Sequence, residues 1–214
     1  MNTNQWDVLL VKSGVGIVQA QQWAAAFSAV ISDSVMGKEE TFAFLGQVLW
    51  ESSYLTRLEE DLENYTPQRL LEVFKGRITP AQAAQYGKTP TQKANPQGIA
   101  NIVYGGAWGK KYLGNTEPWD GWAFRGSGPF QITGRDNVTA AAKWTELPYL
   151  EHPELLRKPG YEAVEACVWY WKTRVGDHWK DATALRKAVN GGTLGLKETI
   201  ALTSTVSSAW EAIA

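Results

Sequence analysis

The amino-acid sequence predicts a mainly α-helical protein. Two long stretches, Ile17–Ile31 and Glu39–Glu51, carry apolar residues at spacings of three and four, which is the period of an amphipathic helix. Three further positions, Thr66, Thr79 and Asn95, place a capping side chain directly before proline. This pair satisfies a backbone N–H at the start of a helix and fixes the first helical φ, so we expect a shorter helix after each.

Glycine and proline interrupt this helical pattern in one long stretch. Between Gly105 and Gly134 lie Gly106, Gly109, Gly114, Pro118, Gly121, Gly126, Gly128 and Pro129. So many breakers disfavour a long helix and predict a loop, with at most a short hairpin. Helical periodicity resumes in four later segments: Asp136–Trp144, Tyr161–Val175, Asp181–Val189 and Leu196–Ile213.

Length and composition predict one globular domain over residues 1–214. Hydrophobic residues make up 44% of the chain and charged residues 20%, which is ordinary for a folded protein. The formal net charge of −1 gives no electrostatic reason to expect nucleic acid or an anionic membrane as a partner. The start of the chain lacks the pattern of a secretory leader, and no apolar run reaches the roughly 18 residues of a membrane span, so we expect no membrane insertion.

The few cysteines and histidines disfavour several kinds of site. Cys167 is the only cysteine, so no disulfide forms within the chain, and its apolar surroundings favour a core position over catalysis. His152 and His178 are the only histidines and have no ligand-spaced neighbours, so we expect neither a metal nor another cofactor. The 11 tryptophans are consistent with sugar binding through flat indole faces, although most tryptophans fill the core of a protein.

Two glutamates are the candidates for acid and base chemistry. Glu51 ends an apolar helix, where burial would raise its pKa and keep it protonated as a general acid. Glu60 lies in the acidic run 59–63, where solvation would keep a carboxylate ionised and able to act as a base. A plain solvated acidic face explains that run equally well.

Helix geometry adds a condition for this pair. Nine residues along one helix would turn the second carboxylate by about 180° and displace it by about 13 Å. For Glu51 and Glu60 to face one substrate, the chain must therefore leave the helix soon after Glu51, and the stretch Ser52–Tyr54 is a suitable place.

Several motifs, in order along the chain, resemble glycoside hydrolase family 19, and in particular its phage endolysin branch. The resemblance spans residues from about 15 to 195. The motifs that carry it are Phe44–Tyr54 (FLGQVLWESSY), Leu58–Tyr65 (LEEDLENY), Ile99–Gly106 (IANIVYGG), Gly121–Arg135 (GWAFRGSGPFQITGR) and Val189–Gly192 (VNGG). The stretch from Arg125 to Gly134 is the most specific of them. The resemblance implies a lysozyme-like helical domain of two lobes with a central substrate cleft.

The same resemblance assigns roles by position. It makes Glu51 the general acid, Glu60 the general base that activates water, and Thr133 a residue that holds this water through its hydroxyl. It also implies six substrate-binding residues: Tyr104, Trp122, Arg125, Gln131, Asn137 and Asn190. A buried polar network is the alternative reading of Gln131 and Thr133, and the Asn190 turn also fits the end of a helix.

The chain departs from the family pattern at three places. Trp50 stands where the family usually has histidine, the residues 52–54 replace glycines, and Ser127 replaces the second arginine of the central signature. Loss of the histidine removes a polar neighbour of Glu51, so the activity and its pH optimum are expected to differ from those of other members. Neither carboxylate is lost.

The resemblance implies an inverting hydrolase of β-1,4-linked N-acetylated amino sugars, with no covalent intermediate. We expect a monomeric enzyme that cuts the glycan strands of peptidoglycan, as a lysozyme of muramidase type. It would be made in the cytoplasm of a phage-infected bacterium and reach the wall after release by a holin. A chitinase of the same family and a wall-binding module without turnover are the alternatives, and Trp50 is the feature that favours the latter.

Overall fold

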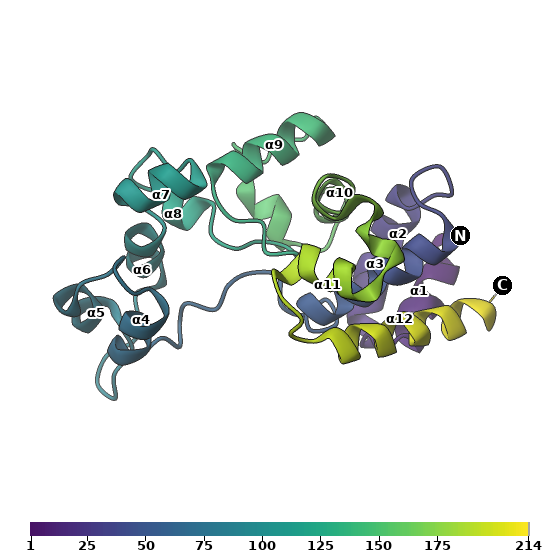
Figure 1. Ribbon diagram of the computed structural model, residues 1–214, viewed down its shortest axis with the longest axis horizontal. Helices are drawn as coiled ribbons and strands as arrows, with labels where there is room; N and C mark the ends of the chain where they lie inside the picture. The colour runs from purple at the N-terminus through teal and green to yellow at the C-terminus, as the bar shows by residue number, and fades with distance from the viewer. Residues whose placement is uncertain (214) are drawn as a thin grey trace. The chain divides into compact units, whose positions relative to one another are not determined.

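The computed structural model describes residues 1–213, whose regular structure is helical (Figure 1). Within these residues the extended backbone forms only isolated β-bridges and no strand. The prediction of a mainly α-helical protein is therefore confirmed. Contacts within the chain define two compact units: unit 1 contains residues 1–58, 128–130 and 154–213, and unit 2 contains residues 59–127 and 131–153.

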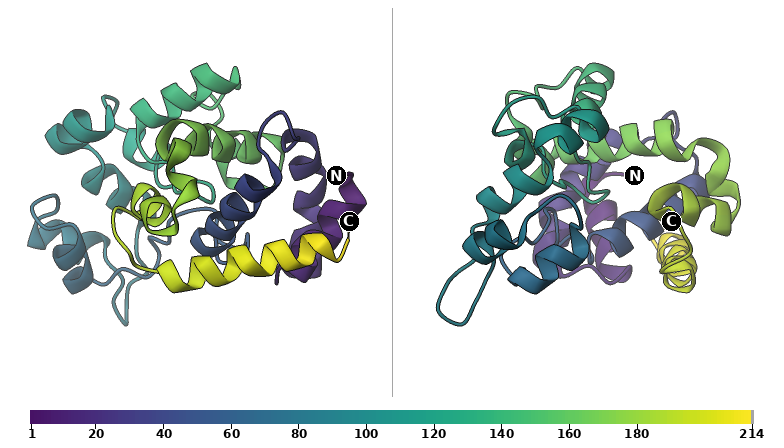
Figure 2. Two further views of the ribbon diagram at one scale, coloured as in Figure 1. Left: turned by 45° about the vertical axis from the view of Figure 1, so that its right-hand side comes forward. Right: turned by 60° about the vertical axis from the view of Figure 1, so that its left-hand side comes forward.

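Unit 1 is built around the helix that ends at Glu51. Its helices are α1 (Thr3–Lys12), α2 (Ile17–Val30), α3 (Lys38–Glu51), α10 (Tyr161–Tyr170), α11 (Ala182–Asn190) and α12 (Leu196–Glu211). A 3-10 turn, η1 (Pro153–Arg157), precedes α10, and a π-helical turn, η2 (Trp171–Val175), and a 3-10 turn, η3 (Gly176–Lys180), follow it. In α3 every residue from 41 to 49 is buried, and α12 packs along it (Figure 2).

Aromatic side chains fill much of the core of unit 1. Trp6 stacks on Phe27 with ring centroids 5.2 Å apart, and Phe44 meets Trp171 edge to face at 5.3 Å. Such pairs contribute about 0.5–1.5 kcal/mol beyond the burial of their area. Cys167 lies in this core, and burial raises the pKa of its thiol, as expected for a packing residue and not for a nucleophile.

Unit 2 has a smaller core of its own. Its helices are α4 (Pro67–Val73), α5 (Pro80–Tyr86), α6 (Pro96–Val103), α7 (Gly106–Leu113), α8 (Asp120–Ala123) and α9 (Arg135–Thr145). Leu62, Leu70, Phe74, Ile99 and Val103 are buried in one cluster. Because each of these helices is short, their stability depends mainly on this shared apolar contact.

The capping signals located helix starts accurately. Thr66, Thr79 and Asn95 are the N-caps of α4, α5 and α6, each accepts a hydrogen bond from a backbone N–H of the first turn, and proline follows each. In contrast, α7 and α8 contradict the prediction of loop throughout 105–134, and α1 was not predicted. Gly105 and Gly114 flank α7, so these two glycines border a short helix instead of preventing it.

The chain leaves α3 directly after Glu51, as the geometry of the carboxylate pair required. Ser53, Tyr54 and Leu55 have φ values of 49°, 59° and 66°, a left-handed turn that is rare for residues with a side chain. Each such residue costs about 1–2 kcal/mol, which burial of the Leu55 side chain helps to offset. Ser52 also stabilises this turn, since its hydroxyl donates to the Val48 carbonyl and accepts from the Leu55 N–H.

We predict that Ser52→Ala lowers the free energy of unfolding by about 1–3 kcal/mol, because it leaves the buried N–H of Leu55 without its acceptor. Urea unfolding at neutral pH measures this difference. Ser53→Ala is the matched control, since Ser53 is exposed and its hydroxyl forms no hydrogen bond with the turn in the described residues. Equal stability of the Ser52 and Ser53 variants would contradict the assignment of Ser52 as the residue that holds the turn.

None of the helices in residues 1–213 is long and apolar enough to cross a membrane.

Candidate active site

A short pairing of two segments positions Glu60. The Glu60 N–H donates to the Gly126 carbonyl over 3.1 Å, and Glu59 forms an antiparallel bridge with Ser127. Ser127 also bridges Ile132, so the loop from Gly126 to Ile132 closes on itself next to the acidic run. This arrangement brings the acidic run 59–63 next to Gly126, Ser127 and Ile132 of the central signature in unit 2.

Tyr104 binds the Glu60 carboxylate directly. Its hydroxyl lies 2.7 Å from Oε1 and 2.6 Å from Oε2 of Glu60, so the one phenolic proton is shared between both oxygens. Tyr104 follows α6 as its C-cap, and its own carbonyl accepts from the side chain of Asn115 over 2.8 Å. The residue predicted to line a groove is therefore a direct partner of the candidate base.

Burial raises the pKa of Glu60 above its ordinary value, while the Tyr104 hydrogen bond and the charges of Arg77 and Arg125 partly oppose that rise. A raised pKa means that the folded chain binds a proton more tightly than the unfolded chain. The stability that this group contributes at low pH is therefore lost as pH rises through the raised pKa. The same environment raises the pKa of the Tyr104 phenol, which stays a proton donor.

Arg77 is held near Glu60 by aromatic rings. Its guanidinium lies 4.9 Å from the ring centroid of Phe74 and 4.2 Å from that of Trp108. Phe74 in turn meets Tyr104 edge to face at 6.0 Å. The stacked position places a positive charge near Glu60 without a direct ion pair between them.

The hollow that contains Glu60 has a volume of about 400 Å³, and its walls are formed by Glu59, Glu60, Asp61, Leu62, Glu63, Pro96, Trp122 and Arg125. Arg125 is buried and forms an ion pair with Glu59, and its guanidinium stacks over the Trp122 ring at 3.6 Å. Trp122 and Arg125, predicted to bind substrate, therefore form one wall with an indole face and a fixed cation. Such a wall suits a sugar, whose C–H face stacks on indole.

The Thr133 hydroxyl donates its proton within the protein, so its oxygen can accept a hydrogen bond from a water molecule. Its hydroxyl donates to the Gln131 carbonyl over 2.9 Å, so its oxygen keeps lone pairs for a further donor. Gln131 has a φ of 50°, a strained backbone value of the kind that clusters at functional sites. A Cβ on Gly126 would lie 2.7 Å from Oε1 of Gln131, so a larger residue there would require the end of that side chain to shift.

Asn137 is tied to the same loop, because its amide donates to the Thr133 carbonyl over 2.8 Å at the start of α9. The candidate residues in unit 2 are thus Glu60, Tyr104, Trp122, Arg125, Gln131, Thr133 and Asn137. Hydrogen bonds or ring contacts connect them in three groups: Glu60 with Tyr104, Arg125 with Trp122, and Thr133 with Gln131 and Asn137.

Glu51 lies in unit 1 beside an arginine that the sequence did not single out. Arg186, on α11, is buried, and its Nη1 lies 2.5 Å from Oε1 of Glu51. The same guanidinium donates to the side chain of Gln47 over 2.9 Å and to the carbonyl of Leu194 over 2.5 Å. A basic residue among the apolar positions of an amphipathic helix was the signal that sequence reasoning passed over.

The predicted environments of the two carboxylates were wrong. Glu51 was expected in apolar surroundings but lies beside the charge of Arg186, and Glu60 was expected to be solvated but is half-buried with a raised pKa. The reason is that tertiary contacts, and not neighbours in the sequence, set both environments. Glu59 and Glu63, by contrast, are exposed, as the alternative of a solvated face predicts for the rest of the run.

Asn190 and Trp50 border the loop that follows α11. Asn190 is exposed at the last position of that helix, and Gly191, with a φ of 77°, ends it in the left-handed conformation. The Trp50 indole lies so close to Gly195 that a Cβ there would be 2.3 Å from Nε1. The unusual tryptophan thus packs against the same loop whose carbonyl, at Leu194, binds Arg186.

Comparison with known proteins gives the family. The chain is 31% identical over 175 residues to a glycosyl hydrolase family 19 domain-containing protein of Haemophilus influenzae, covering 81% of this chain and 82% of that protein. This chain belongs to glycoside hydrolase family 19. A scan against protein-family models found no match.

The fold agrees with that of solved members of glycoside hydrolase family 19. Chitinase C from Streptomyces griseus HUT6037 superposes with a TM-score of 0.53 at 16% identity, over 98% of this chain and 76% of that one. A glutamate-to-glutamine mutant of chitinase C gives a TM-score of 0.54 at 15% identity, with the same coverage. The predicted lysozyme-like helical fold of this family is therefore confirmed.

We predict that Tyr104→Phe raises the pKa of Glu60 further, because it removes a hydrogen bond that favours the charged carboxylate while leaving the burial in place. Titration of the Glu60 side-chain carbon by NMR measures the change. Tyr65→Phe is the control. Burial and the charge of Glu60 raise the pKa of Tyr65, but Tyr65 forms no hydrogen bond to Glu60. A pKa of Glu60 that stays constant or falls in Tyr104→Phe would contradict the bond.

Proposed function

We propose that this family 19 protein hydrolyses the β-1,4 bonds of bacterial peptidoglycan strands with inversion, using Glu51 as the acid and Glu60 as the base. The observation that carries this proposal is the setting of Glu60. It is a half-buried carboxylate held by Tyr104, in a hollow with an indole face and a fixed arginine. An inverting reaction needs the carboxyl groups about 6.5–9.5 Å apart, so that water fits between the base and the sugar.

The raised pKa of Glu60 suits a general base. A carboxylate whose pKa is closer to neutral takes a proton from water more readily than an ordinary one. The Tyr104 hydroxyl fixes the carboxylate, and lone pairs on both oxygens remain to accept from water. Thr133, with its own proton already donated, would accept the second hydrogen of the same water.

Arg186 favours the ionised form of Glu51. This is the form that remains after Glu51 donates its proton to the leaving sugar oxygen, so the guanidinium opposes protonation of the acid before the reaction and stabilises the carboxylate after it. The bonds of Arg186 to Gln47 and Leu194 hold the guanidinium in place during the reaction. No metal takes part in this scheme.

Two features favour peptidoglycan over chitin. The single Cys167 is incompatible with the disulfide framework of plant-type chitinases. In addition, a second hollow in unit 2 carries Lys88 and Lys93, which match an anionic polymer better than neutral chitin. Chitin remains the second candidate because the solved structures of similar fold are named chitinases.

The biological setting that we propose is a phage or prophage endolysin. It would be a monomer made in the bacterial cytoplasm and reach the wall after release by a holin. Loss of turbidity of outer-membrane-permeabilised cells, compared with hydrolysis of chitin oligomers, tests the substrate. Lysis without chitin cleavage supports the proposal, and chitin cleavage without lysis would replace it by the chitinase. Binding to walls without either activity would identify a non-catalytic wall-binding module.

We predict that Glu51→Gln and Glu60→Gln both fold and lose nearly all lytic activity, since an amide neither donates the proton nor accepts one from water. Glu59→Gln is the matched control: it is adjacent, and it changes the charge equally. It should keep more activity than either of them, because Glu59 pairs with Arg125 at the wall of the hollow and takes no part in the proposed proton transfers. Initial lysis rates of the three variants measure these effects. If Glu59→Gln loses nearly all activity and Glu60→Gln stays active, then Glu59 and not Glu60 is the general base.

We predict that Thr133→Val lowers the rate of lysis about 10²- to 10³-fold, by analogy with the removal of other preorganised contacts. Valine has nearly the same shape as threonine but cannot accept from water. Thr133→Ser should keep much of the activity, and binding of wall fragments should change little in either variant. A Val variant that lyses like wild type, or whose defect lies wholly in binding, would show that Thr133 is only a structural hydroxyl.

A further inference from the structure

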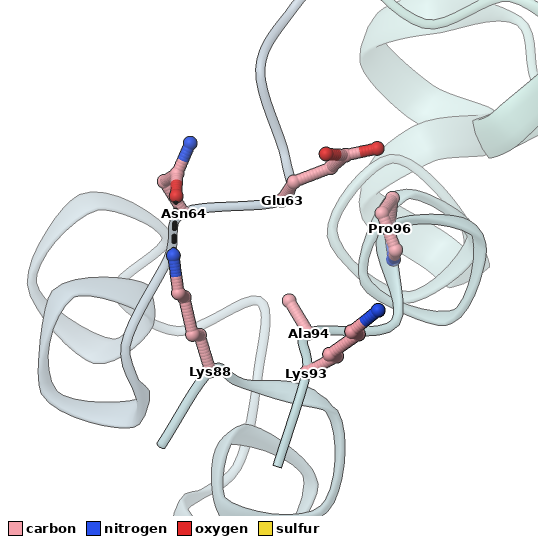
Figure 3. A pocket seen from close by; sticks show the side chains of 6 residues that line it. All are labelled: Glu63, Asn64, Lys88, Lys93, Ala94 and Pro96. Carbon is pink, nitrogen blue, oxygen red and sulfur yellow. Dashed lines mark hydrogen bonds between the residues drawn. The ribbon is translucent and has the colours of Figure 1, made fainter. Parts of the chain in front are cut away.

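A second hollow of about 380 Å³ lies next to the one that contains Glu60. Its walls are formed by Glu63, Asn64, Lys88, Lys93, Ala94 and Pro96. Glu63 and Pro96 belong to the walls of both hollows, so the two adjoin along this edge. Figure 3 shows Glu63 and Asn64 on one side of the hollow and Lys88 and Lys93 on the other.

Within residues 1–213, neither lysine of this hollow forms a direct ion pair with a carboxylate, although the Asn64 hydrogen bond and, to a lesser degree, the charge of Lys88 lower the pKa of Asp61. Lys88 donates to the neutral Oδ1 of Asn64 over 2.7 Å, and the Asn64 amide donates in turn to Asp61 over 2.8 Å. Within residues 1–213, Lys93 forms neither a hydrogen bond nor an ion pair, and Lys88 has no carboxylate partner. Both ammonium groups thus keep donors for a ligand, and the wall carries two positive charges against the one of Glu63.

The backbone around the lysines is fixed before any ligand arrives. The Lys88 N–H donates to the Tyr65 carbonyl over 2.8 Å, which ties the lysine segment to the acidic run. The Gln92 side chain donates to the carbonyls of Ala84, Gln85 and Gly87, and so pins the loop that connects the two lysines. A site held in this way loses less entropy on binding than a flexible pair of surface lysines.

We propose that this hollow binds a carboxylate carried by the lactyl side group of the muramyl sugar, while the neighbouring hollow holds the glycan at Glu60. This inference rests on the proposed peptidoglycan substrate and names the part of it that is recognised. Chitin has no such carboxylate, so the hollow would distinguish the two polymers. On strands that bear a peptide stem the lactyl carboxyl is bound to the stem as an amide, so the carboxylate belongs to the stem. On strands without a stem it is the lactyl carboxylate itself. Glu63 favours a stem that also carries an ammonium group.

The test uses the full-length protein with the double substitution Lys88→Gln and Lys93→Gln. The matched control, Lys75→Gln with Lys143→Gln, removes two exposed lysines of the same unit that line neither hollow. Three substrates are compared: solubilised peptidoglycan with its stems, strands from which an amidase has removed the stems, and N-acetylated chitin oligomers. Amidase treatment leaves the lactyl carboxylate free, so the first two substrates distinguish its source.

We expect the double substitution to raise KM for stem-bearing peptidoglycan about 3- to 10-fold, the effect of two partly exposed ion pairs, with kcat unchanged. Any cleavage of chitin oligomers that the wild-type protein shows should stay as in the control, and added salt should reduce the difference in KM. A rise confined to stem-bearing strands assigns the stem carboxylate, and a rise confined to stripped strands assigns the lactyl carboxylate. An equal rise on both shows that the hollow binds either carboxylate.

Unchanged KM on both peptidoglycan substrates would overturn the inference while leaving the proposed function intact. An equal loss on all three substrates would also overturn it, since damage to the fold then explains the result. If the wild-type protein cleaves chitin oligomers but neither peptidoglycan substrate, the proposed function itself fails.

Discussion

The pairing of Glu59 and Glu60 with Gly126 and Ser127 is the contact on which the candidate site of unit 2 depends. It joins an acidic run to the central signature more than sixty positions later, and it fixes both sides of the join at the backbone. Arg125, one residue before this contact, then reaches Glu59, and the Gln131 side chain fits against Gly126 because no Cβ stands in its way. Burial of the Glu60 carboxylate, and therefore its raised pKa, follows from the same contact.

Local chemistry explains which parts of the fold could be predicted from sequence. A cap followed by proline acts within four residues, so Thr66, Thr79 and Asn95 marked helix starts reliably. The end of α3 could be predicted because Glu51 and Glu60 can face one substrate only if the chain leaves the helix soon after Glu51. A left-handed turn at residues 53–55 ends the helix there. The prediction of loop throughout 105–134 was wrong because glycine disfavours a helix only in its interior. At the ends of α7, Gly105 and Gly114 are caps and do not interrupt the helix.

The electrostatic environments were not predictable, because they depend on residues far apart in the chain. Nothing near Glu51 in the sequence indicates Arg186, which comes from α11, and nothing near Glu60 indicates the burial that Tyr104 and its aromatic neighbours provide. The roles assigned by family resemblance are independent of this error, and they remain predictions. The two environments differ: a buried guanidinium contacts Glu51, and burial raises the pKa of Glu60.

Trp50 connects this electrostatic arrangement to the departure of the chain from its family. Its indole occupies the space beside Gly195, where the φ of 79° and the close contact both exclude a side chain. The loop so held supplies the Leu194 carbonyl to Arg186, and Arg186 supplies its charge to Glu51. Where the family resemblance places a histidine, this chain therefore has a side chain that does not titrate and that packs against the loop bound to Arg186. The arginine that contacts Glu51 keeps its charge at every physiological pH, so this contact does not change its charge in the range where histidine titrates.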